Sequence, residues 1–172
     1  MKKEALLILF VFAFVAFAAG QDVQIKDQKA FFYAYLECTG SYSQISAKIG
    51  EFMGEFFGQG LGSFTGVMAL YFNMPGEVPE AELKWRVGMP IGKEAEPAAP
   101  LRKDVFDFPK VASYLYVGPY EKVGEAYGKV MAYIEQNGWK IAGPPMEMYL
   151  NNPMSVPPEK LETEIIIPVE KK

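Results

Sequence analysis

One short segment of the chain places a carboxylate two residues before a tyrosine, so that a β-strand would put both side chains on the same face. In MEMYL, residues 146–150, Glu147 and Tyr149 share one strand face while Met146 and Met148 share the other. A carboxylate next to a tyrosine can attract a cation or position a water molecule for proton transfer. We expect the methionines to face the helix-covered side of the sheet, so that Glu147 and Tyr149 line an open cleft on the other side.

Further aromatic side chains are candidates for stacking on a ligand or for cation–π contacts, which are worth about 0.5–2 kcal/mol each. Tyr114 and Tyr116 alternate with Leu115 and Val117, which sends both rings to one face. The other candidates are Tyr71, Trp85, Tyr120 and Trp139. For each single ring, packing into the core is the alternative interpretation.

The composition excludes several kinds of site. The chain has no histidine, which removes the commonest zinc ligand, a His-based catalytic triad and a histidine haem ligand. Cys38 is the single cysteine, and without a histidine to activate it we interpret it as a packed residue. The net charge of −4 argues against a nucleic-acid partner, because phosphate binding needs a clustered basic surface. We expect a small-molecule ligand, no metal and no cofactor.

An internal repeat organises the chain. Gly40 and Tyr42 match Gly118 and Tyr120, which sets an offset of 78 residues (120 − 42 = 78). The same offset pairs Ile45 with Val123, Ile49 with Tyr127, Phe52 with Val130, Met53 with Met131, Tyr71 with Tyr149 and Pro90 with Pro168. A constant offset through helix, turn and strand patterns favours a structural duplication. We interpret Gly-x-Tyr as a backbone device in which glycine permits an unusual turn.

Each unit has the predicted order β-α-β-β. Apolar spacing predicts helices at about 42–57 and 120–137. Strands are predicted at about 30–38, 66–72 and 82–89, and again at 111–117, 144–150 and 161–167. We predict an α+β domain with pseudo-twofold symmetry and at most eight mainly antiparallel strands, with both helices on one sheet face and the ligand cleft on the other.

The offset also bears on the second acidic candidate, Glu164, in the closing segment at 161–169. It places Arg86 at the position equivalent to Glu164, and Ala69 at the position equivalent to Glu147. An ion pair between Arg86 and Glu164 is one interpretation, and contact of both side chains with a ligand is the other. For Glu147 the alternative is a solvated glutamate on an exposed strand.

Residues 1–20, MKKEALLILFVFAFVAFAAG, have the basic start, apolar run and small-residue end of a secretory signal peptide. We expect a periplasmic or secreted protein that meets the membrane only during export. The alternative is an uncleaved anchor, although the run is short for a bilayer span of about 20 residues. The mature domain is expected at 21–172, with units at about 30–92 and 105–172 and a Pro/Ala/Glu-rich connector at 92–104. Formation of a homo-oligomer stays open.

The second unit resembles the GyrI-like small-molecule-binding domain, which also forms the effector-binding part of AraC-type and multidrug-sensing regulators. The likeness lies in VGPYEKVGEAYGKVMAYIEQNG, in GPPMEMYLNNP and in the closing strand with its Glu and Pro. The first unit departs from this pattern, with Gly-Ser-Tyr in place of Gly-Pro-Tyr. The resemblance implies two β-α-β-β units about a pseudo-twofold axis and a pocket carboxylate that attracts cationic, aromatic ligands. Glu147 resembles that residue, and Glu164 resembles the family's second acidic position.

These observations leave three classes of function. We favour a binding module that captures apolar, aromatic or cationic small molecules between the two units. The alternative is a GyrI-like hydrolase of reactive small molecules, in which Glu147, Glu164 and Tyr149 surround the attacking water. Two acids and a tyrosine converging on one spot would indicate hydrolysis, whereas one acid among aromatics would indicate capture. A protein-interaction domain with a filled cleft is the third class. With a signal-like segment in place of a DNA-binding region, we expect no direct role in transcription.

Overall fold

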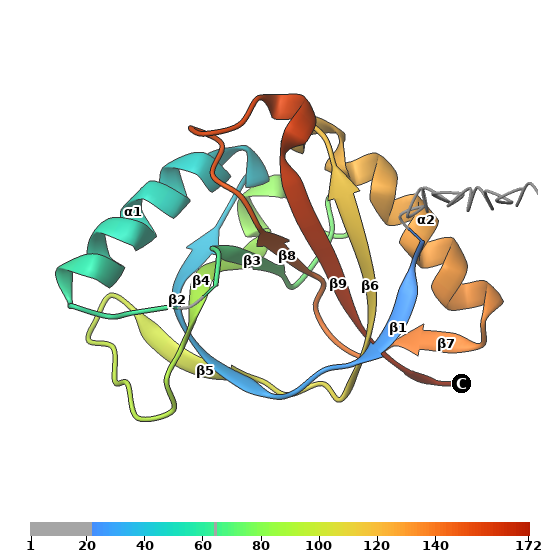
Figure 1. Cartoon of the computed structure of the whole chain (residues 1–172), viewed down its shortest axis with the longest axis horizontal. Coiled ribbons are helices and arrows are strands. Elements are labelled where there is room, and N and C mark those ends of the chain that lie inside the picture. Colours follow the sequence, from blue (N-terminus) through green and yellow to red (C-terminus); the bar gives the residue numbers. More distant parts are fainter. Residues whose placement is uncertain (1–21, 64) are drawn as a thin grey trace, which may run out of the picture.

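The computed structural model describes residues 22–63 and 65–172, so the predicted signal peptide lies outside the described residues. The described chain forms one curved sheet of nine antiparallel strands with two main helices, as Figure 1 shows. The strand order is β1-β6-β9-β8-β3-β4-β2-β5, and β7 pairs with β9. This confirms the predicted α+β class and its antiparallel sheet. Within this part of the chain no helix is long and apolar enough to cross a membrane.

The two halves repeat element by element at the predicted offset. Strands β1 (Gln24–Asp27), β2 (Phe31–Thr39), β3 (Met68–Tyr71) and β4 (Lys84–Ile91) belong to the first half, with helix α1 (Ile45–Gly58). Strands β5 (Arg102–Phe106), β6 (Lys110–Val117), β8 (Met146–Tyr149) and β9 (Glu162–Lys171) belong to the second, with α2 (Val123–Gln136) and the additional β7 (Trp139–Ile141). Both α1 and β3 lie 78 residues before α2 and β8 (123 − 45 and 146 − 68).

Short 3-10 turns repeat in the same way and complete the two halves. Tyr42–Gln44 precedes α1 and Tyr120–Lys122 precedes α2, while Glu80–Glu82 and Pro158–Lys160 precede the last strands. Because β1, β2, β3 and β4 correspond to β5, β6, β8 and β9, the strand order reads the same from both ends. These observations fit a duplicated unit related by a pseudo-twofold axis between β3 and β8.

The first strand of each half crosses over to the other half, which the sequence patterns did not predict. Strand β1 pairs with β6 of the second half, and β5 pairs with β2 of the first half. Strand β5 begins at Arg102, inside the segment expected to be connector, and the sheet has nine strands rather than eight at most. The sequence QIKD of β1 shows no apolar alternation, and in this edge strand Gln24 and Asp27 are exposed while Ile25 and Lys26 are half-buried.

Both helices pack on the same face of the sheet. Phe52 and Phe56 of α1 are fully buried against Leu36 and Val87, while Val130 of α2 is buried in a cluster with strands β6 and β9. Figure 1 shows α1 and α2 well apart, on either side of the central strands. Each helix covers the outer strands of its own half, so the centre of this face is left without a helix above it.

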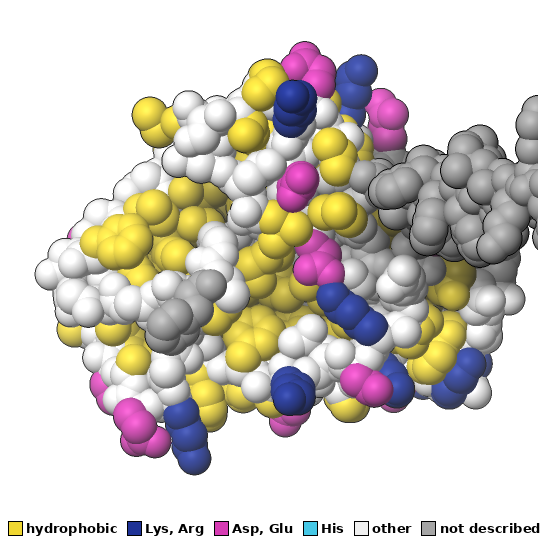
Figure 2. Space-filling model, in the orientation of Figure 1, with side chains coloured by type: hydrophobic (Ala, Val, Ile, Leu, Met, Phe, Trp, Pro, Cys, Tyr) yellow, Lys and Arg dark blue, Asp and Glu magenta, His cyan; other side chains and the backbone are white. Residues whose placement is uncertain are grey.

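The opposite face of the sheet is filled by side chains of the chain itself. Tyr33, Met68, Met146, Met148 and Ile166 belong to one buried apolar cluster. In the view of Figure 1, Figure 2 shows apolar side chains gathered near the middle and charged ones spread mainly around the periphery. The methionines therefore pack on the face away from the helices, which is the reverse of the predicted orientation.

Both helices carry exposed glycines, Gly54 in α1 and Gly128 in α2, which lower helix stability. An added Cβ at Gly54 or Gly128 would meet nothing within 4 Å. We expect Gly54→Ala and Gly128→Ala each to raise the free energy of unfolding by about 0.4–1 kcal/mol, by restricting the unfolded chain. Urea denaturation measures the change.

The contrasting variant is Gly88→Ala on β4, where the new Cβ would lie 2.6 Å from the carbonyl oxygen of Ala34. Because backbone must shift to admit this atom, we expect a loss of roughly 1–3 kcal/mol. Equal changes in the free energy of unfolding at the helix positions and at Gly88 would contradict the inferred difference in space around these glycines.

Candidate functional site

A cavity of about 1010 Å³ lies between the two helices, above the junction of β3 and β8. One wall comes from α1 and the other from α2, and the floor comes from the two central strands. The lining side chains are mostly apolar, and those of the helices include Ile45, Ile49, Met53, Val123, Tyr127 and Met131. The prediction that the cleft lies on the face away from the helices is thus wrong. The helices stand apart over the central strands, while the other face is occupied by the chain's own core.

Glu147 lies in the cavity lining and is only 6% exposed. Tyr127 of α2 donates a hydrogen bond to its Oε1 at 3.0 Å. Tyr149 and Tyr71 donate to Oε2 at 3.0 and 3.3 Å, so that each half supplies one of these two hydroxyls. Since a buried carboxylate is costly unless its lone pairs are satisfied, the three tyrosines are what allow the acid to sit there.

The electrostatics of this cluster leave a single group that can carry charge near neutral pH. Burial raises the pKa of Glu147, and the three tyrosine hydrogen bonds act in the opposite direction. Burial also raises the pKa of Tyr71, Tyr127 and Tyr149 well above 10, and the charge of Glu147 adds to this shift. The tyrosines therefore stay neutral donors, and the cavity carries at most one negative charge from this cluster.

Two further tyrosines flank the floor in matching positions. The ring of Tyr42 packs edge-on against Tyr71 at 4.8 Å and 65°, and Tyr120 packs against Tyr149 at 5.3 Å and 65°. The glycine that begins each Gly-x-Tyr turn has a positive φ, 98° at Gly40 and 152° at Gly118. Glycine adopts such a backbone conformation readily, in agreement with its expected role in the turn. The motif does more than turn the chain, because both of its tyrosines line the cavity.

The structure brings four of the candidate residues together and separates the others. Glu147, Tyr149, Tyr71 and Tyr120 line the cavity. Trp85 is buried in the core beside Tyr42, with its Nε1 donating to the carbonyl of Gly40. Tyr114, Tyr116 and Trp139 pack in the cluster around α2, and Glu164 and Arg86 lie on the other sheet face. These six are not among the residues that line the cavity.

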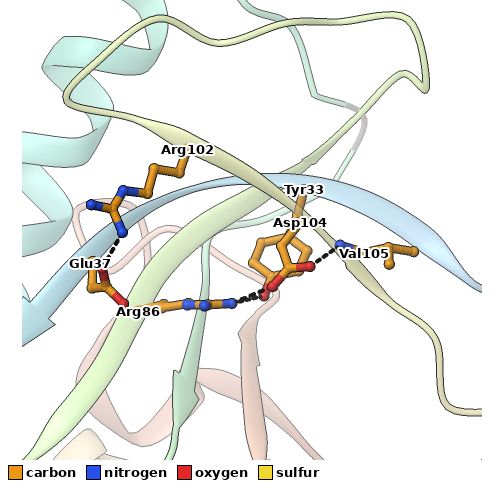
Figure 3. A network of polar contacts seen from close by, with 6 residues as sticks. All are labelled: Tyr33, Glu37, Arg86, Arg102, Asp104 and Val105. Atoms are coloured by element: carbon orange, nitrogen blue, oxygen red, sulfur yellow. Dashed lines mark hydrogen bonds and ion pairs between the residues drawn. The ribbon is translucent and has the colours of Figure 1, made fainter.

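Arg86 and Glu164 each have a separate partner, so the interpretation of an ion pair between them is wrong. Arg86 Nη1 donates to Asp104 Oδ2 at 2.6 Å and to Tyr33 Oη at 2.7 Å, as Figure 3 shows. Lys26 forms the ion pair with Glu164. The two pairs occupy equivalent positions with their charges reversed (104 − 26 = 78 and 164 − 86 = 78).

Both pairs tie an exchanged edge strand to the opposite half. Asp104 belongs to β5 and holds Arg86 of β4, and its Oδ1 accepts from the backbone N–H of Val105. Next to them Arg102 of β5 reaches Glu37 of β2 at 2.6 Å (Figure 3). The guanidinium of Arg86 also lies 4.0 Å from the ring centre of Tyr35. Their position gives these charges a structural role on the face opposite the cavity.

Sequence reasoning missed the helix contribution to the site. The sequence patterns identify Tyr127 only as the repeat partner of Ile49, yet its hydroxyl donates a hydrogen bond to Oε1 of Glu147. A signal was present in the repeat, because the equivalent residue is the apolar Ile49 and a tyrosine on a buried helix face needs a hydrogen-bond partner. Cys38 is buried away from the cavity lining, and burial raises the pKa of its thiol to about 11, which agrees with a packed residue.

An apolar cavity with one buried acid, set between two helices on an antiparallel sheet, defines a small-molecule-binding α+β domain. The family model of the GyrI-like small molecule binding domain matches residues 21–170, and the chain belongs to this family. No curated protein sequence matches the chain.

Solved structures share the fold at low sequence identity. EcmrR in its complex with DNA has a TM-score of 0.75 and 18% identity over 88% of this chain, which spans 58% of the EcmrR chain. A hydrolase from Listeria innocua has a TM-score of 0.61 and 11% identity, over 87% of this chain and 92% of its own. SAV2435 bound to tetraphenylphosphonium has a TM-score of 0.59 and 17% identity, and the match covers 87% of this chain and 94% of the SAV2435 chain.

The raised pKa of Glu147 predicts a specific dependence of stability on pH. In the unfolded chain this carboxyl returns to its ordinary value of 4.5, so between that value and the raised folded pKa the folded state binds more protons. Stability contributed by this group is therefore present below about pH 4.5 and is lost as the pH rises through the folded pKa. We expect Glu147→Gln to remove this loss, so that the variant gains stability relative to the natural protein as the pH rises.

Urea denaturation from pH 4 to pH 8 measures this difference. Glu159→Gln, at an exposed position, controls for the loss of a negative charge. Parallel stability curves for the natural protein and Glu147→Gln would show that the buried acid does not titrate as described.

Proposed function

We propose that the protein captures an apolar, aromatic cation in the cavity between α1 and α2. The observation that carries this proposal is the single buried carboxylate, Glu147, held by three tyrosine hydroxyls at the floor of an apolar cavity. A bound cation would pair with the acid and offset the cost of its burial. Apolar walls favour an organic body around that charge.

The chemistry of the walls favours a cation whose charge is spread or shielded. A small, strongly hydrated ion would lose its water without gaining oxygen ligands, because among the described residues no cluster of three or more Cys, Asp or Glu side chains could hold a metal. A bulky organic cation loses less hydration and gains contact with the methionine, isoleucine and tyrosine side chains. Tetraphenylphosphonium, the molecule named with SAV2435, belongs to this chemical class and supports its choice as a probe.

The arrangement of acids favours capture over hydrolysis. The hydrolytic alternative places Glu147 and Glu164 around one water molecule, but these carboxylates lie on opposite faces of the sheet. Within the described part of the chain, Glu147 is the one carboxylate among the cavity-lining residues. The likeness to the Listeria hydrolase is one of fold. The open cavity also favours a ligand over the third class, which expects a filled cleft.

The binding proposal predicts that tetraphenylphosphonium binds and that Glu147→Gln weakens its binding at least tenfold, because the variant loses the countercharge. Isothermal titration at pH 8, with quenching of tryptophan fluorescence as a second readout, measures the affinity. The matched control is Glu164→Gln, which removes an equal charge on the other face and should change the affinity less than twofold. An equal loss in both variants would point to a general effect of charge and would contradict the proposal.

We further propose that residues 1–20 direct export of the domain, on the basis of their signal-peptide pattern. Expression of the full chain in a bacterium, followed by fractionation and N-terminal sequencing, tests this. We expect the domain in the periplasm or medium with its first residue near position 21. Recovery of the chain in the membrane fraction with Met1 retained would support the anchor instead.

A further inference from the structure

The cavity is built from equivalent residues of the two halves. Eight pairs of lining residues are related by the offset of 78: Tyr42 and Tyr120, Ile45 and Val123, Ser46 and Gly124, Ile49 and Tyr127, Met53 and Met131, Tyr71 and Tyr149, Met74 and Asn152, Pro75 and Pro153. The two sides of the cavity therefore have similar chemistry. We call them the α1 lobe, lined by Ile45, Ile49 and Met53, and the α2 lobe, lined by Val123, Tyr127 and Met131.

The charge of the cavity does not follow this symmetry. Glu147 of β8 pairs directly with Ala69 of β3, its equivalent in the first half, at the centre of the strand order. Ala69 is fully buried and offers no polar group, so one carboxylate serves both lobes. The acid accepts hydroxyl hydrogen bonds from Tyr71 and Tyr149, one from each half, which places it between the lobes.

The two lobes differ in their lining residues, although they agree in chemistry. The ring of Tyr127 reaches Glu147 from the α2 side, where the α1 side has the smaller Ile49. Val67 and Met89 line the cavity on the first-half side, whereas their equivalents, Pro145 and Ile167, are not among the lining residues. Leu150 and Met154 line the second-half side, whereas their equivalents, Phe72 and Gly76, are not among the lining residues, so each lobe has some apolar wall that the other lacks.

We propose, on the basis of the proposed function, that the ligand is a monocation with two apolar arms, which lies with its charge over Glu147 and one arm in each lobe. One carboxylate balances one positive charge, and a second charge would be buried without a partner. A ligand with a single arm would leave one apolar lobe unfilled and would lose that contact area.

Two probes with the same charge test this inference. Dibenzyldimethylammonium has two aromatic arms, and benzyltrimethylammonium has one. We expect the two-armed probe to bind the natural protein at least tenfold more tightly. A ratio below two, or failure of both probes to bind a protein that binds tetraphenylphosphonium, would overturn the inference.

Helix glycines allow each lobe to be filled separately. Gly50 of α1 and Gly124 of α2 both line the cavity, and an added Cβ at either would meet nothing within 4 Å. We expect Gly50→Leu and Gly124→Leu each to weaken the two-armed probe at least fivefold. Each should weaken the one-armed probe less than twofold, because its arm can enter the lobe that stays open. The double variant should bind neither probe.

The matched controls are Gly54→Leu and Gly128→Leu, which make the same change in the same helices at positions outside the cavity lining. Both should bind the probes as the natural protein does. If one cavity variant weakens both probes and the other weakens neither, the site has a single lobe and the inference fails. The proposed function fails separately, when tetraphenylphosphonium does not bind or binds Glu147→Gln equally well.

Discussion

The hydrogen bonds from three tyrosine hydroxyls to Glu147 are the interaction on which the site depends. An isolated carboxylate at this depth would be strongly disfavoured, because burial penalises its charged form. Tyr71, Tyr127 and Tyr149 come from β3, α2 and β8, so the acid is satisfied only after both halves and one helix are in place. The site is therefore a product of the complete fold, and its carboxyl group is positioned before any ligand arrives.

The strand order explains why there is a cavity above this acid. Strands β3 and β8 meet at the centre of an order that reads the same from both ends, and each helix packs on the strands of its own half. The exchanged edge strands β1 and β5 fasten the halves together from the other face, through the ion pairs of Lys26 with Glu164 and of Arg86 with Asp104. Because these ion pairs lie on the face opposite the cavity, the helices need not contact each other to hold the two halves together.

Membership in the GyrI-like family and the geometry of the cavity lead to the same class of activity by independent routes. The family model covers nearly all of the described chain and carries small-molecule binding in its description. The cavity has the apolar walls and the few convergent polar groups that small-molecule sites share. The solved structures that resemble the chain are different kinds of protein, including a DNA-bound regulator and a hydrolase, so the fold alone does not select among them.

By itself the sequence determined the repeat, the two helices, the order of the six predicted strands and the alternation that puts Glu147 and Tyr149 on one strand face. These follow from local spacing, which the backbone obeys wherever it lies. Only the tertiary structure decided which face the helices cover, because Met146 and Met148 are apolar enough to pack on either side. It also decided the pairing of β1 with β6 and the meeting of Tyr127 with Glu147. Such contacts join distant segments through burial and register, for which a short stretch of sequence carries no periodic signal.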